Sequence, residues 1–530
     1  MTDPTSSATP NRASSTPDTA PTAAPAEALR VAVIGAGPAG FYAAGHLLAH
    51  KSDRFEVDMF ERLPTPWGLV RSGVAPDHPK IKSVTRIYER TAAHPRFRFF
   101  GNIAFGLHLS CEDLRRHYHA IVYATGSPAD RPLGIPGEHL PGSHAATEFV
   151  GWYNGHPDHT DLEVDLVSTP RAVVIGNGNV ALDVARMLVL SPAELAPTDT
   201  ADHALDVLAR SQVHEVVVVG RRGPAQAAFT NPELRELADL ADADIIVDPD
   251  ELERALSVPD PQAAEDATAR RNVEILRAYA STPPAGRSKR IVLRFLLSPV
   301  ALLAGEGRQG EGGDGEAAGE GGGKTGPGDD DGKGDGHLSA VELVHNRLVA
   351  TDDGRLRAEP TGERETIEAG LVFRAIGYRG MPLPDVPFDE RAATILNRGG
   401  RVLDPDSGEP LPGEYVVGWI KRGPSGVIGT NKKDAQETVD AMFADLLPTD
   451  SASDTPTHSI PAKVHTPTDP DPDTIEGLLR ERQPDLITYE GWESIDRHER
   501  ALGEPAGRPR VKLTRIEELL RAAASEQPVP

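Results

Sequence analysis

Two glycine-spaced turns in this chain have the residue types and spacing that bind nucleotide phosphates. Residues 31–40 read Val-Ala-Val-Ile-Gly-Ala-Gly-Pro-Ala-Gly, so an apolar strand runs directly into Gly-x-Gly-x-x-Gly. Gly35 permits the tight turn, Gly37 lets the backbone approach a pyrophosphate, and Gly40 lets the next helix pack closely on the strand. The phosphates then lie at a helix N-terminus, where unpaired N–H groups and the helix dipole favour an anion.

A carboxylate follows the first turn at the distance that ribose binding requires. Glu61 stands 21 residues after Gly40, at the end of the next predicted strand, where it can accept hydrogen bonds from ribose hydroxyls. A glycine-rich turn beside an unrelated surface glutamate is the alternative interpretation.

The second turn, residues 172–181, reads Ala-Val-Val-Ile-Gly-Asn-Gly-Asn-Val-Ala, with alanine at the third glycine position. Its first two glycines are Gly176 and Gly178, and the next comparable strand ends in Arg221 and Arg222 instead of an acid. A carboxylate there would repel a 2′-phosphate, whereas guanidinium groups bind one through paired, charge-assisted hydrogen bonds. The pair indicates NADP rather than NAD, although a solvated arginine pair at a strand end is the alternative.

Two turns with opposite ribose chemistry suggest FAD at the first and NADPH at the second. An electron path from nicotinamide to flavin follows from that arrangement.

Short strands rich in valine and isoleucine alternate with helical stretches, which is typical of a doubly wound α/β fold with parallel sheets. The predicted strands include residues 31–34, 57–60, 120–124, 172–175 and 216–219.

The 530 residues predict two or three domains with substantial cores. Residues 1–28 are mostly Pro, Ser, Thr and Ala, which predicts a disordered tail without a targeting signal. Residues 305–336 contain 15 glycines and nine acidic residues, which predicts a flexible surface insertion. After residue 447, proline and threonine clusters indicate a linker into a helical tail.

The counts of charged residues and cysteines exclude several classes of protein. The net charge of −25 argues against a general nucleic-acid binder, which needs a basic surface. Cys111 is the single cysteine, so the chain alone cannot form a redox cysteine pair or a cysteine-ligated cluster. No apolar run is long enough for a membrane span, and we expect a cytoplasmic protein with no protein-bound metal.

Four longer motifs extend this interpretation. They are Pro-Trp-Gly-Leu-Val-Arg-Ser-Gly-Val-Ala-Pro-Asp-His-Pro at 66–79, the run 176–186, Gly-Arg-Arg-Gly-Pro at 220–224, and Gly-Trp-Ile-Lys-Arg-Gly-Pro-Ser-Gly-Val-Ile-Gly-Thr at 418–430. In this order they resemble the adrenodoxin-reductase-like ferredoxin-NADP+ reductases, particularly the bacterial form.

The resemblance implies two Rossmann-like dinucleotide-binding domains, with the NADP domain inserted into the FAD domain. Residues 29–130 and 375–450 would form the FAD domain, and residues 131–374 the NADP domain. Residues 451–530 would be a linker and a helical tail that packs on the FAD domain.

The resemblance also implies binding residues for each cofactor. Contacts to FAD would come from Ala39, Glu61, Leu69, Phe105, Trp419, Gly426, Val427 and Ile428. Contacts to NADP would come from Arg131, Asn177, Gly178, Asn179, Val180, Arg221, Arg222, Glu233 and the backbone of Gly426.

Residues 426–430 are suited to a flavin on physical grounds as well. This glycine-spaced turn precedes a helix that we predict from Lys432 onward, so its N–H groups and dipole could stabilise negative charge on a reduced flavin. A plain helix N-terminus is the alternative.

Two residues are candidates for roles at the reacting centre. By the same resemblance, His78 would lie near the flavin ring, where it tunes or hydrogen-bonds the site, and Glu236 would help to position the nicotinamide. A structural histidine in a loop is the alternative for His78.

The resulting hypothesis is that NADPH gives a hydride to FAD, and that electrons then pass singly to two ferredoxin molecules. An NADPH-dependent flavin monooxygenase is one alternative, because Phe149, Gly151 and His156 partly match a Baeyer-Villiger motif. An NADPH-binding, redox-sensing flavoprotein is another.

A ferredoxin partner is usually acidic, so docking needs a local cationic surface on this acidic chain. The candidates are Arg287, Lys289, Arg290 and Arg294, with Arg235 and Lys421 as further members, and solvated charges are the alternative for each.

Overall fold

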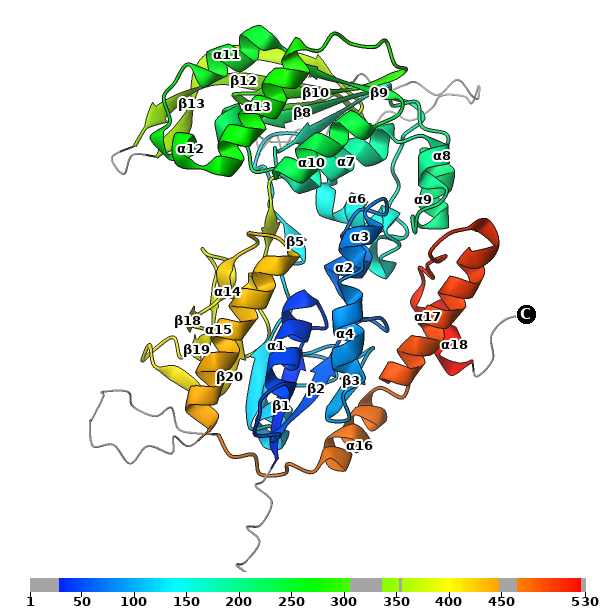
Figure 1. Ribbon diagram of the computed structural model, residues 1–530, viewed down its shortest axis with the longest axis vertical. Helices are drawn as coiled ribbons and strands as arrows, with labels where there is room; N and C mark the ends of the chain where they lie inside the picture. Colours follow the sequence, from blue (N-terminus) through cyan, green and yellow to red (C-terminus); the bar gives the residue numbers. More distant parts are fainter. Residues whose placement is uncertain (1–27, 306–335, 352–354, 448–464, 526–530) are drawn as a thin grey trace, which may run out of the picture.

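The computed structural model describes residues 28–305, 336–351, 355–447 and 465–525, which form two lobes stacked along the long axis (Figure 1). The predicted tail and glycine-rich insertion, and most of the predicted linker, lie outside these residues. The two lobes are each built around one sheet.

The first lobe contains a seven-stranded sheet in the order β18-β19-β20-β4-β1-β2-β3. The five strands from β20 to β3 are parallel, and β18 and β19 add an antiparallel edge. All six residues of β1 are buried, as an apolar run in a central parallel strand requires. The strands are β1 Leu29–Ile34, β2 Phe55–Phe60, β3 Phe97–Phe100, β4 Ala120–Tyr123, β18 Asn397–Arg398, β19 Arg401–Leu403 and β20 Pro410–Val416.

Helices cover both faces of this sheet. One apolar cluster joins β1 and β2 to α1, α4 and α15, and a second joins the opposite face to α5. The helices are α1 Pro38–Leu48, α2 Leu69–Ser72, α3 Pro79–Lys82, α4 Thr85–Ala92, α5 Cys111–His117, α14 Trp419–Arg422 and α15 Ile428–Leu446. A small hairpin, β16 Phe388–Asp389 with β17 Thr394–Ile395, completes the lobe.

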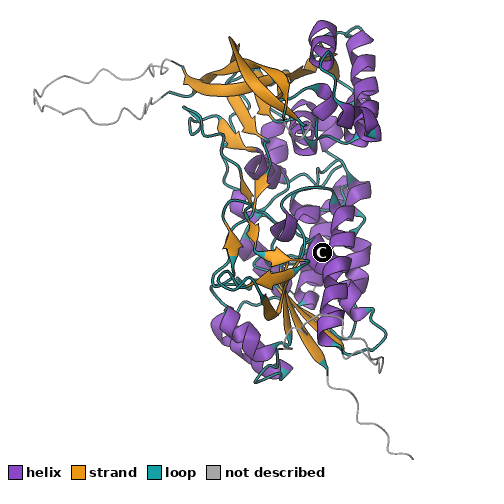
Figure 2. Cartoon of the chain, turned by 90° about the vertical axis from the view of Figure 1, so that its left-hand side faces the viewer, coloured by secondary structure: helices purple, strands orange, loops and turns teal. Residues whose placement is uncertain are grey.

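The second lobe contains a six-stranded parallel sheet in the order β6-β14-β7-β8-β10-β9. A three-stranded antiparallel sheet packs on one of its faces, opposite the helical layer (Figure 2). The parallel strands are β6 Ser143–Ala145, β7 Arg171–Ile175, β8 Glu215–Gly220, β9 Ala243–Val247, β10 Lys289–Phe295 and β14 Leu371–Arg374. The antiparallel strands are β11 Leu297–Ala304, β12 Leu338–Ala350 and β13 Leu356–Glu368.

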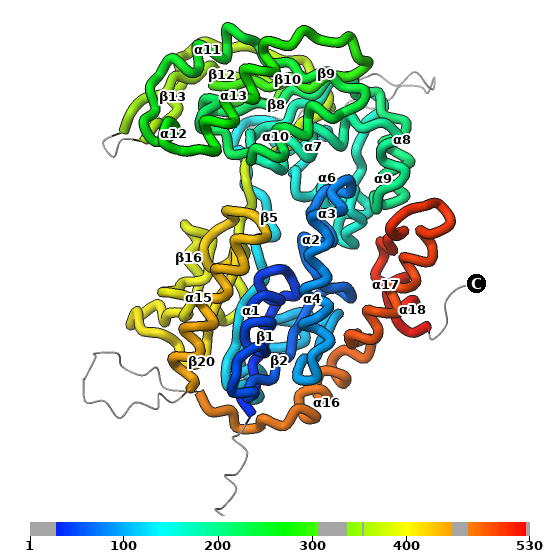
Figure 3. Tube along the Cα trace, viewed as in Figure 1, coloured from blue at the N-terminus to red at the C-terminus, as the bar shows by residue number. Residues whose placement is uncertain are grey.

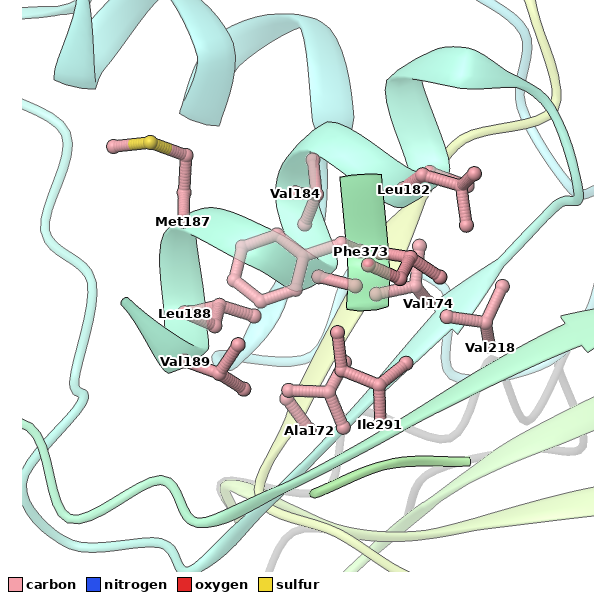
Figure 4. Close-up of a cluster of buried hydrophobic side chains, with 14 of the residues drawn as sticks. Ala172, Val174, Leu182, Val184, Met187, Leu188, Val189, Val218, Ile291 and Phe373 are labelled. Atoms are coloured by element: carbon pink, nitrogen blue, oxygen red, sulfur yellow. The ribbon is translucent and has the colours of Figure 1, made fainter. Parts of the chain in front are cut away.

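The helical face of the second lobe carries its largest apolar cluster. Figure 4 shows Phe373 of β14 among side chains of α7 and of the sheet, and the ring is fully buried. The helices of this lobe are α6 Ala146–Tyr153, α7 Asn179–Val189, α8 Pro192–Leu195, α9 Asp202–Leu208, α10 Asn231–Glu236, α11 Pro249–Leu256, α12 Pro261–Glu265 and α13 Ala267–Ser281.

The chain crosses between the lobes twice, and the two crossings pair with each other. Their strands, β5 Ala129–Asp130 and β15 Tyr378–Arg379, form a short antiparallel ribbon. In the described residues after α15 the chain forms the α-helices α16 Pro472–Arg482, α17 Tyr489–Gly503 and α18 Ile516–Ala524.

The predicted α/β class and its parallel sheets are confirmed. Each of the five predicted strands overlaps a strand of one of the two parallel sheets, namely β1, β2, β4, β7 and β8.

A buried histidine makes the stability of the second lobe depend on pH. His144 of β6 stacks on Phe373, and burial, assisted by the charge of Arg374, lowers its pKa from 6.5 to about 4. Between these values the unfolded chain binds a proton that the folded chain excludes, so stability is lost as the pH falls. Between pH 7 and pH 5 we expect the free energy of unfolding to fall by ~2 kcal/mol more in wild type than in His144→Gln.

Thermal unfolding at the two pH values measures this difference. His139→Gln, at an exposed position, is the matched control and should keep the wild-type pH dependence. Parallel unfolding temperatures for wild type and His144→Gln across this range would contradict the prediction.

Candidate functional site

The first glycine turn connects β1 to α1, and its three glycines differ in what surrounds them. Gly35 has a φ of +108°, and a Cβ there would lie 2.6 Å from the carbonyl oxygen of Ala124. A Cβ on Gly40 would lie 2.2 Å from the oxygen of Gly35, whereas one on Gly37 would meet nothing within 4 Å. Gly35 and Gly40 are thus required by packing, and Gly37 leaves room for a ligand to approach the backbone.

Glu61 follows β2 and is oriented by this turn. Its Oε2 accepts a hydrogen bond from the Ala36 amide at 3.0 Å, and its Oε1 accepts one from the Leu63 amide at 3.1 Å. Burial raises the pKa of Glu61 above its usual value, and these amide donors oppose the rise. The carboxylate is held at the mouth of the turn, as ribose binding requires.

Two segments far apart in sequence pack against the same turn. The Trp67 amide donates to the Ala36 oxygen at 2.8 Å, and a Cβ on Gly68 would lie 3.0 Å from the Cα of Gly37. Gly418, just before α14, is so close that its Cβ would lie 2.6 Å from the Cβ of Ala39.

Polar groups around the turn are left without partners. The indole N–H groups of Trp67 and Trp419 are buried and have no hydrogen-bond partner in the described part of the chain. Leu69, the first residue of α2, is 38% exposed. Buried donors of this kind usually have a partner, so these fit a site that a bound molecule completes.

The stretch 426–428 forms the start of α15. Gly426 has a φ of +77°, and the Val427 amide donates to Thr430 Oγ1 at 3.2 Å. The helix begins at Ile428, so the predicted start at Lys432 is wrong by four residues. The threonine hydroxyl caps a turn whose apolar and glycine residues gave no helical signal of their own.

Phe105 packs against the strands that lead to the turn. Its ring packs 6.0 Å from the ring of Tyr123, beside the apolar cluster that contains Ile34 and Cys111.

The second glycine turn, between β7 and α7, resembles the first in having a tightly packed glycine and an open glycine. Gly176 has a φ of +134°, and a Cβ there would lie 2.2 Å from the oxygen of Ala375. A Cβ on Gly178 would meet only the Ala228 Cβ, at 4.0 Å, so the backbone there is open to a ligand.

Two asparagines of this second turn hold the loop that follows β8, Asn179 through its side chain and Asn177 through its backbone oxygen. Asn179 Oδ1 accepts from the Thr230 amide at 2.8 Å, and the Asn177 oxygen accepts from the Ala228 amide at 2.9 Å. The Asn177 Nδ2 is buried without a partner among the described residues, and Val180 packs against the main cluster of the lobe.

Arg221 and Arg222 directly follow β8. Asn346 Nδ2 donates to the Arg221 oxygen at 2.9 Å, and the Leu296 amide donates to the Arg222 oxygen at 3.2 Å. Burial, followed by the charge of Arg221, lowers the pKa of Arg222. Neither guanidinium forms an ion pair with a carboxylate in the described ranges, so both are available to an anion.

A polar cluster joins the lobes. His78 Nε2 of the first lobe lies 2.8 Å from Glu236 Oε2 of α10 and 2.7 Å from Arg186 Nη1 of α7. Arg186 also binds Asp77, and it lies 3.3 Å from Asp183 Oδ1. Nε2 accepts from Arg186 in the tautomer that leaves this nitrogen without a hydrogen, and Glu236 Oε2 is buried beside it without a hydrogen-bond partner in the described chain.

Three members of this cluster, Asp77, Asp183 and Arg186, were not predicted as site residues. Burial, together with the carboxylates of Glu233 and Glu236, raises the pKa of Asp183 to about 7 against the opposing effect of His78. The sequence carries a signal for two of these three site residues, because Asp183 and Arg186 stand three residues apart on a helix immediately after a glycine turn.

Glu233 lies beside the cluster, where its charge acts on Asp183 and Arg186, and Arg131 lies beside the β5–β15 ribbon. The Arg131 amide donates to the Gly377 oxygen at 3.1 Å beside the β5–β15 ribbon, and the side chain is exposed. Glu233 stands on α10 with its Oε2 buried and without a partner in the described chain.

Most members of the predicted cationic patch are paired with acceptors within the chain, and docking at this patch stays a prediction. Arg290 binds Glu215 on the neighbouring strand, Arg294 binds Glu251 at 2.6 Å, and Lys421 binds Asp434 at 2.9 Å. Arg287 donates to backbone oxygens of Leu240 and Ala243. Cross-strand and helix carboxylates neutralise these cations, which the linear spacing of the residues does not reveal.

None of the helices in the described ranges combines the length and apolar composition that crossing a membrane would need.

Comparisons with known proteins agree with this geometry. Residues 29–239 match the model of the pyridine nucleotide-disulphide oxidoreductase family. The chain is 49% identical to NADPH-ferredoxin reductase FprA of Mycobacterium leprae, over 93% of this chain and 97% of that protein. It is 38% identical to mitochondrial NADPH:adrenodoxin oxidoreductase of Arabidopsis thaliana, over 94% of this chain and 96% of that one.

A solved structure matches over the same range. The structure of Mycobacterium tuberculosis FprA in complex with NADPH has 46% sequence identity and a TM-score of 0.79. The match covers 94% of this chain and 100% of that chain.

Proposed function

This chain belongs to the adrenodoxin-reductase-like NADPH-ferredoxin reductases, and we propose that it moves electrons from NADPH to a ferredoxin through FAD. We assign residues 29–130 and 375–450 to FAD binding, residues 131–374 to NADP binding, and residues 451–530 to a linker and a helical tail. The NADP domain is then an insertion in the FAD domain.

The first glycine turn supports the assignment of FAD. The open backbone at Gly37, the oriented Glu61 carboxylate and the unpartnered indole N–H groups fit a dinucleotide. When bound, FAD supplies the conversion from two-electron to one-electron transfer that NADPH and a ferredoxin require. The residues assigned to it are Gly35, Gly37, Ala39, Gly40, Glu61, Leu69, Phe105, Trp419, Gly426, Val427 and Ile428.

The second glycine turn supports the assignment of NADP. The open backbone at Gly178 suits a pyrophosphate, and the two arginines that follow β8 suit a 2′-phosphate. The residues assigned to it are Arg131, Gly176, Asn177, Gly178, Asn179, Val180, Arg221, Arg222, Glu233 and the backbone of Gly426.

The observation that carries the proposal is the meeting of His78 and Glu236 across the lobes. Their 2.8 Å contact brings the segment that follows the first site against the helix that follows the second. We assign His78 and Glu236 to the reacting centre, where they hold the nicotinamide end of the NADP site against the flavin end of the FAD site.

The motif that suggested a monooxygenase has a structural role instead. Phe149 is fully buried and packs 4.6 Å from Phe373, and a Cβ on Gly151 would meet the ring of His159. Nothing in the described residues favours the redox sensor over the reductase. A cytoplasmic location stays a prediction, as does Arg235 as a docking residue.

Anaerobic reduction of the purified yellow protein tests the function. NADPH should bleach the oxidised flavin band within single turnovers, and added ferredoxin should restore that band and sustain NADPH oxidation. An unbleached band would contradict the proposal. Oxygen consumption that depends on an organic substrate would favour the monooxygenase, and turnover no faster than free flavin would favour the sensor.

Glu236→Gln tests the assignment of the reacting centre. The amide keeps the shape of the side chain but loses the charge beside His78 and Arg186, so we expect flavin bleaching by NADPH to slow by ~10-fold. Stopped-flow absorbance measures the rate, and Asp239→Asn, at an exposed position after α10, is the matched control. Equal rates for Glu236→Gln and wild type would remove Glu236 from the centre.

A further inference from the structure

The C-terminal helices α17 and α18 belong to the core of the first lobe. Trp492 and Ile495 of α17 and Leu519 of α18 are buried in the same cluster as Val31 of β1. In Figure 3 the connection between these helices rises along the flank of the first lobe to the level of α9, which belongs to the second lobe.

That connection is bonded to the second lobe at both of its ends. Arg508 donates to the oxygens of Thr198 and Thr200 and binds Asp202 of α9 at 2.5 Å. Further on, the Thr160 hydroxyl donates to the Thr514 oxygen at 2.9 Å, and Arg515 binds Asp161 at 2.5 Å. A segment anchored in one lobe thus runs across the surface of the other.

The middle of this segment enters a buried polar node. The side chain of Lys512 is 1% exposed, and its Nζ donates to the Arg71 oxygen and to Asn154 Oδ1, both at 3.1 Å. Asp199 lies 3.3 Å from the same Nζ and also binds Lys82 of α3 at 2.6 Å. The node joins the first lobe, the second lobe and the C-terminal segment within one set of contacts.

The node fixes the part of the first lobe that links the two candidate sites. Residues 66–82 begin beside the first glycine turn, where the Trp67 amide donates to the Ala36 oxygen. They continue to His78, which contacts Glu236 of the second lobe. The node binds Arg71, which lies between these two contacts in the sequence, and Lys82, which lies just after them.

We propose that residues 508–515 form an interdomain strap, with Lys512 as a positioning residue that sets the distance between nicotinamide and flavin. The inference rests on the proposed function, since it assigns a role in the same hydride transfer. The β5–β15 ribbon pairs only two residues of each crossing, so it leaves the opposite flank of the lobes to be fixed by other contacts. The strap and the node supply those contacts, because Lys512 touches groups from both lobes.

Lys512→Met tests the strap. The variant keeps most of the length of the side chain without its charge and leaves Asp199 paired with Lys82, so the protein should retain FAD. Lys512 is not assigned to the nucleotide site, so the Kd for NADP+ should stay within about twofold of the wild-type value. The rate at which NADPH bleaches the flavin should fall by ~10-fold, because small errors in the reacting geometry are costly. Lys51→Met, at an exposed position after α1, is the control and should match wild type.

Hydrogen exchange supplies a readout that does not depend on activity. In the wild-type holoenzyme, amides of 508–515 should be protected with those of α17, and Lys512→Met should accelerate exchange in 154–161 and 198–202 by about tenfold. A strap that exchanges freely in wild type would overturn the proposal. A lower melting temperature for Lys512→Met with an unchanged bleaching rate would also overturn it.

These outcomes separate the strap from the function. Wild-type protein whose flavin NADPH does not bleach would contradict the reductase activity and with it the positioning role, whatever the exchange pattern. Normal bleaching in wild type with equal bleaching and exchange in Lys512→Met would contradict the strap alone.

Discussion

Replacing both Arg221 and Arg222 by alanine is expected to lower kcat/KM for NADPH by ~10²–10³-fold, about 3–4 kcal/mol. Each guanidinium can make charge-assisted bonds to a 2′-phosphate, and neither forms an ion pair with a carboxylate in the described chain, although the charge of Asp260 acts on Arg222. The loss should appear mainly in KM, because the phosphate is bound equally before and during hydride transfer. Steady-state reduction of a small dye by NADPH measures the effect without ferredoxin.

The comparison with NADH decides whether the phosphate is the group recognised. Since NADH lacks the 2′-phosphate, its kcat/KM should change by less than about threefold in the double variant. Arg254→Ala, at an exposed position of α11, should leave both cofactors unaffected. An equal loss for NADPH and NADH would show that the arginines support the fold of the turn rather than the choice of cofactor.

Glu499→Gln is expected to lower the free energy of unfolding by ~3–5 kcal/mol, because it breaks a buried ion pair. Glu499 is fully buried on α17, and its oxygens lie 2.5 and 2.9 Å from the two terminal nitrogens of Arg71. It also binds Arg510 at 3.0 Å and accepts from the Leu513 amide at 2.9 Å. The amide leaves the Arg71 charge buried without its partner.

The pH dependence of this effect has a definite sign. Burial raises the pKa of Glu499, but Arg71, Arg510 and the Leu513 amide together outweigh it and hold the pKa below the ordinary value of 4.5. The stabilisation is therefore present above pH 4.5 and is lost as the pH falls below it. Chemical unfolding followed by flavin fluorescence measures both effects.

The control for this prediction is Glu490→Gln, at an exposed position of the same helix. Its free energy of unfolding should lie within about 0.5 kcal/mol of the wild-type value. A midpoint for Glu499→Gln as high as that of the control would contradict the importance of the pair.

The parts of the site that lie in one stretch of sequence could be predicted from it. Gly35 and Gly40 are required because the strand, turn and helix of a dinucleotide fold are consecutive, so their spacing is readable along the chain. The open backbone at Gly37 and Gly178 follows from the same local pattern.

The parts that depend on tertiary contacts could not be predicted from spacing. Arg186 meets Asp77 across 109 residues, and Lys512 meets Arg71 across 441, so neither contact leaves a periodic signal. The ion pairs of the cationic patch could not be predicted for the same reason, since the carboxylates that bind Arg290 and Arg294 stand on other elements.

The order of strands in the first sheet has a consequence for how the protein is made. Its central strand β4 pairs with β1 on one side and with β20, residues 410–416, on the other, while every strand of the second sheet lies between residues 143 and 374. During synthesis the second lobe can close while the first still exposes an edge of β4. A chain that ends between residues 380 and 410 should therefore contain a protease-resistant second lobe attached to an unfinished, protease-sensitive first one.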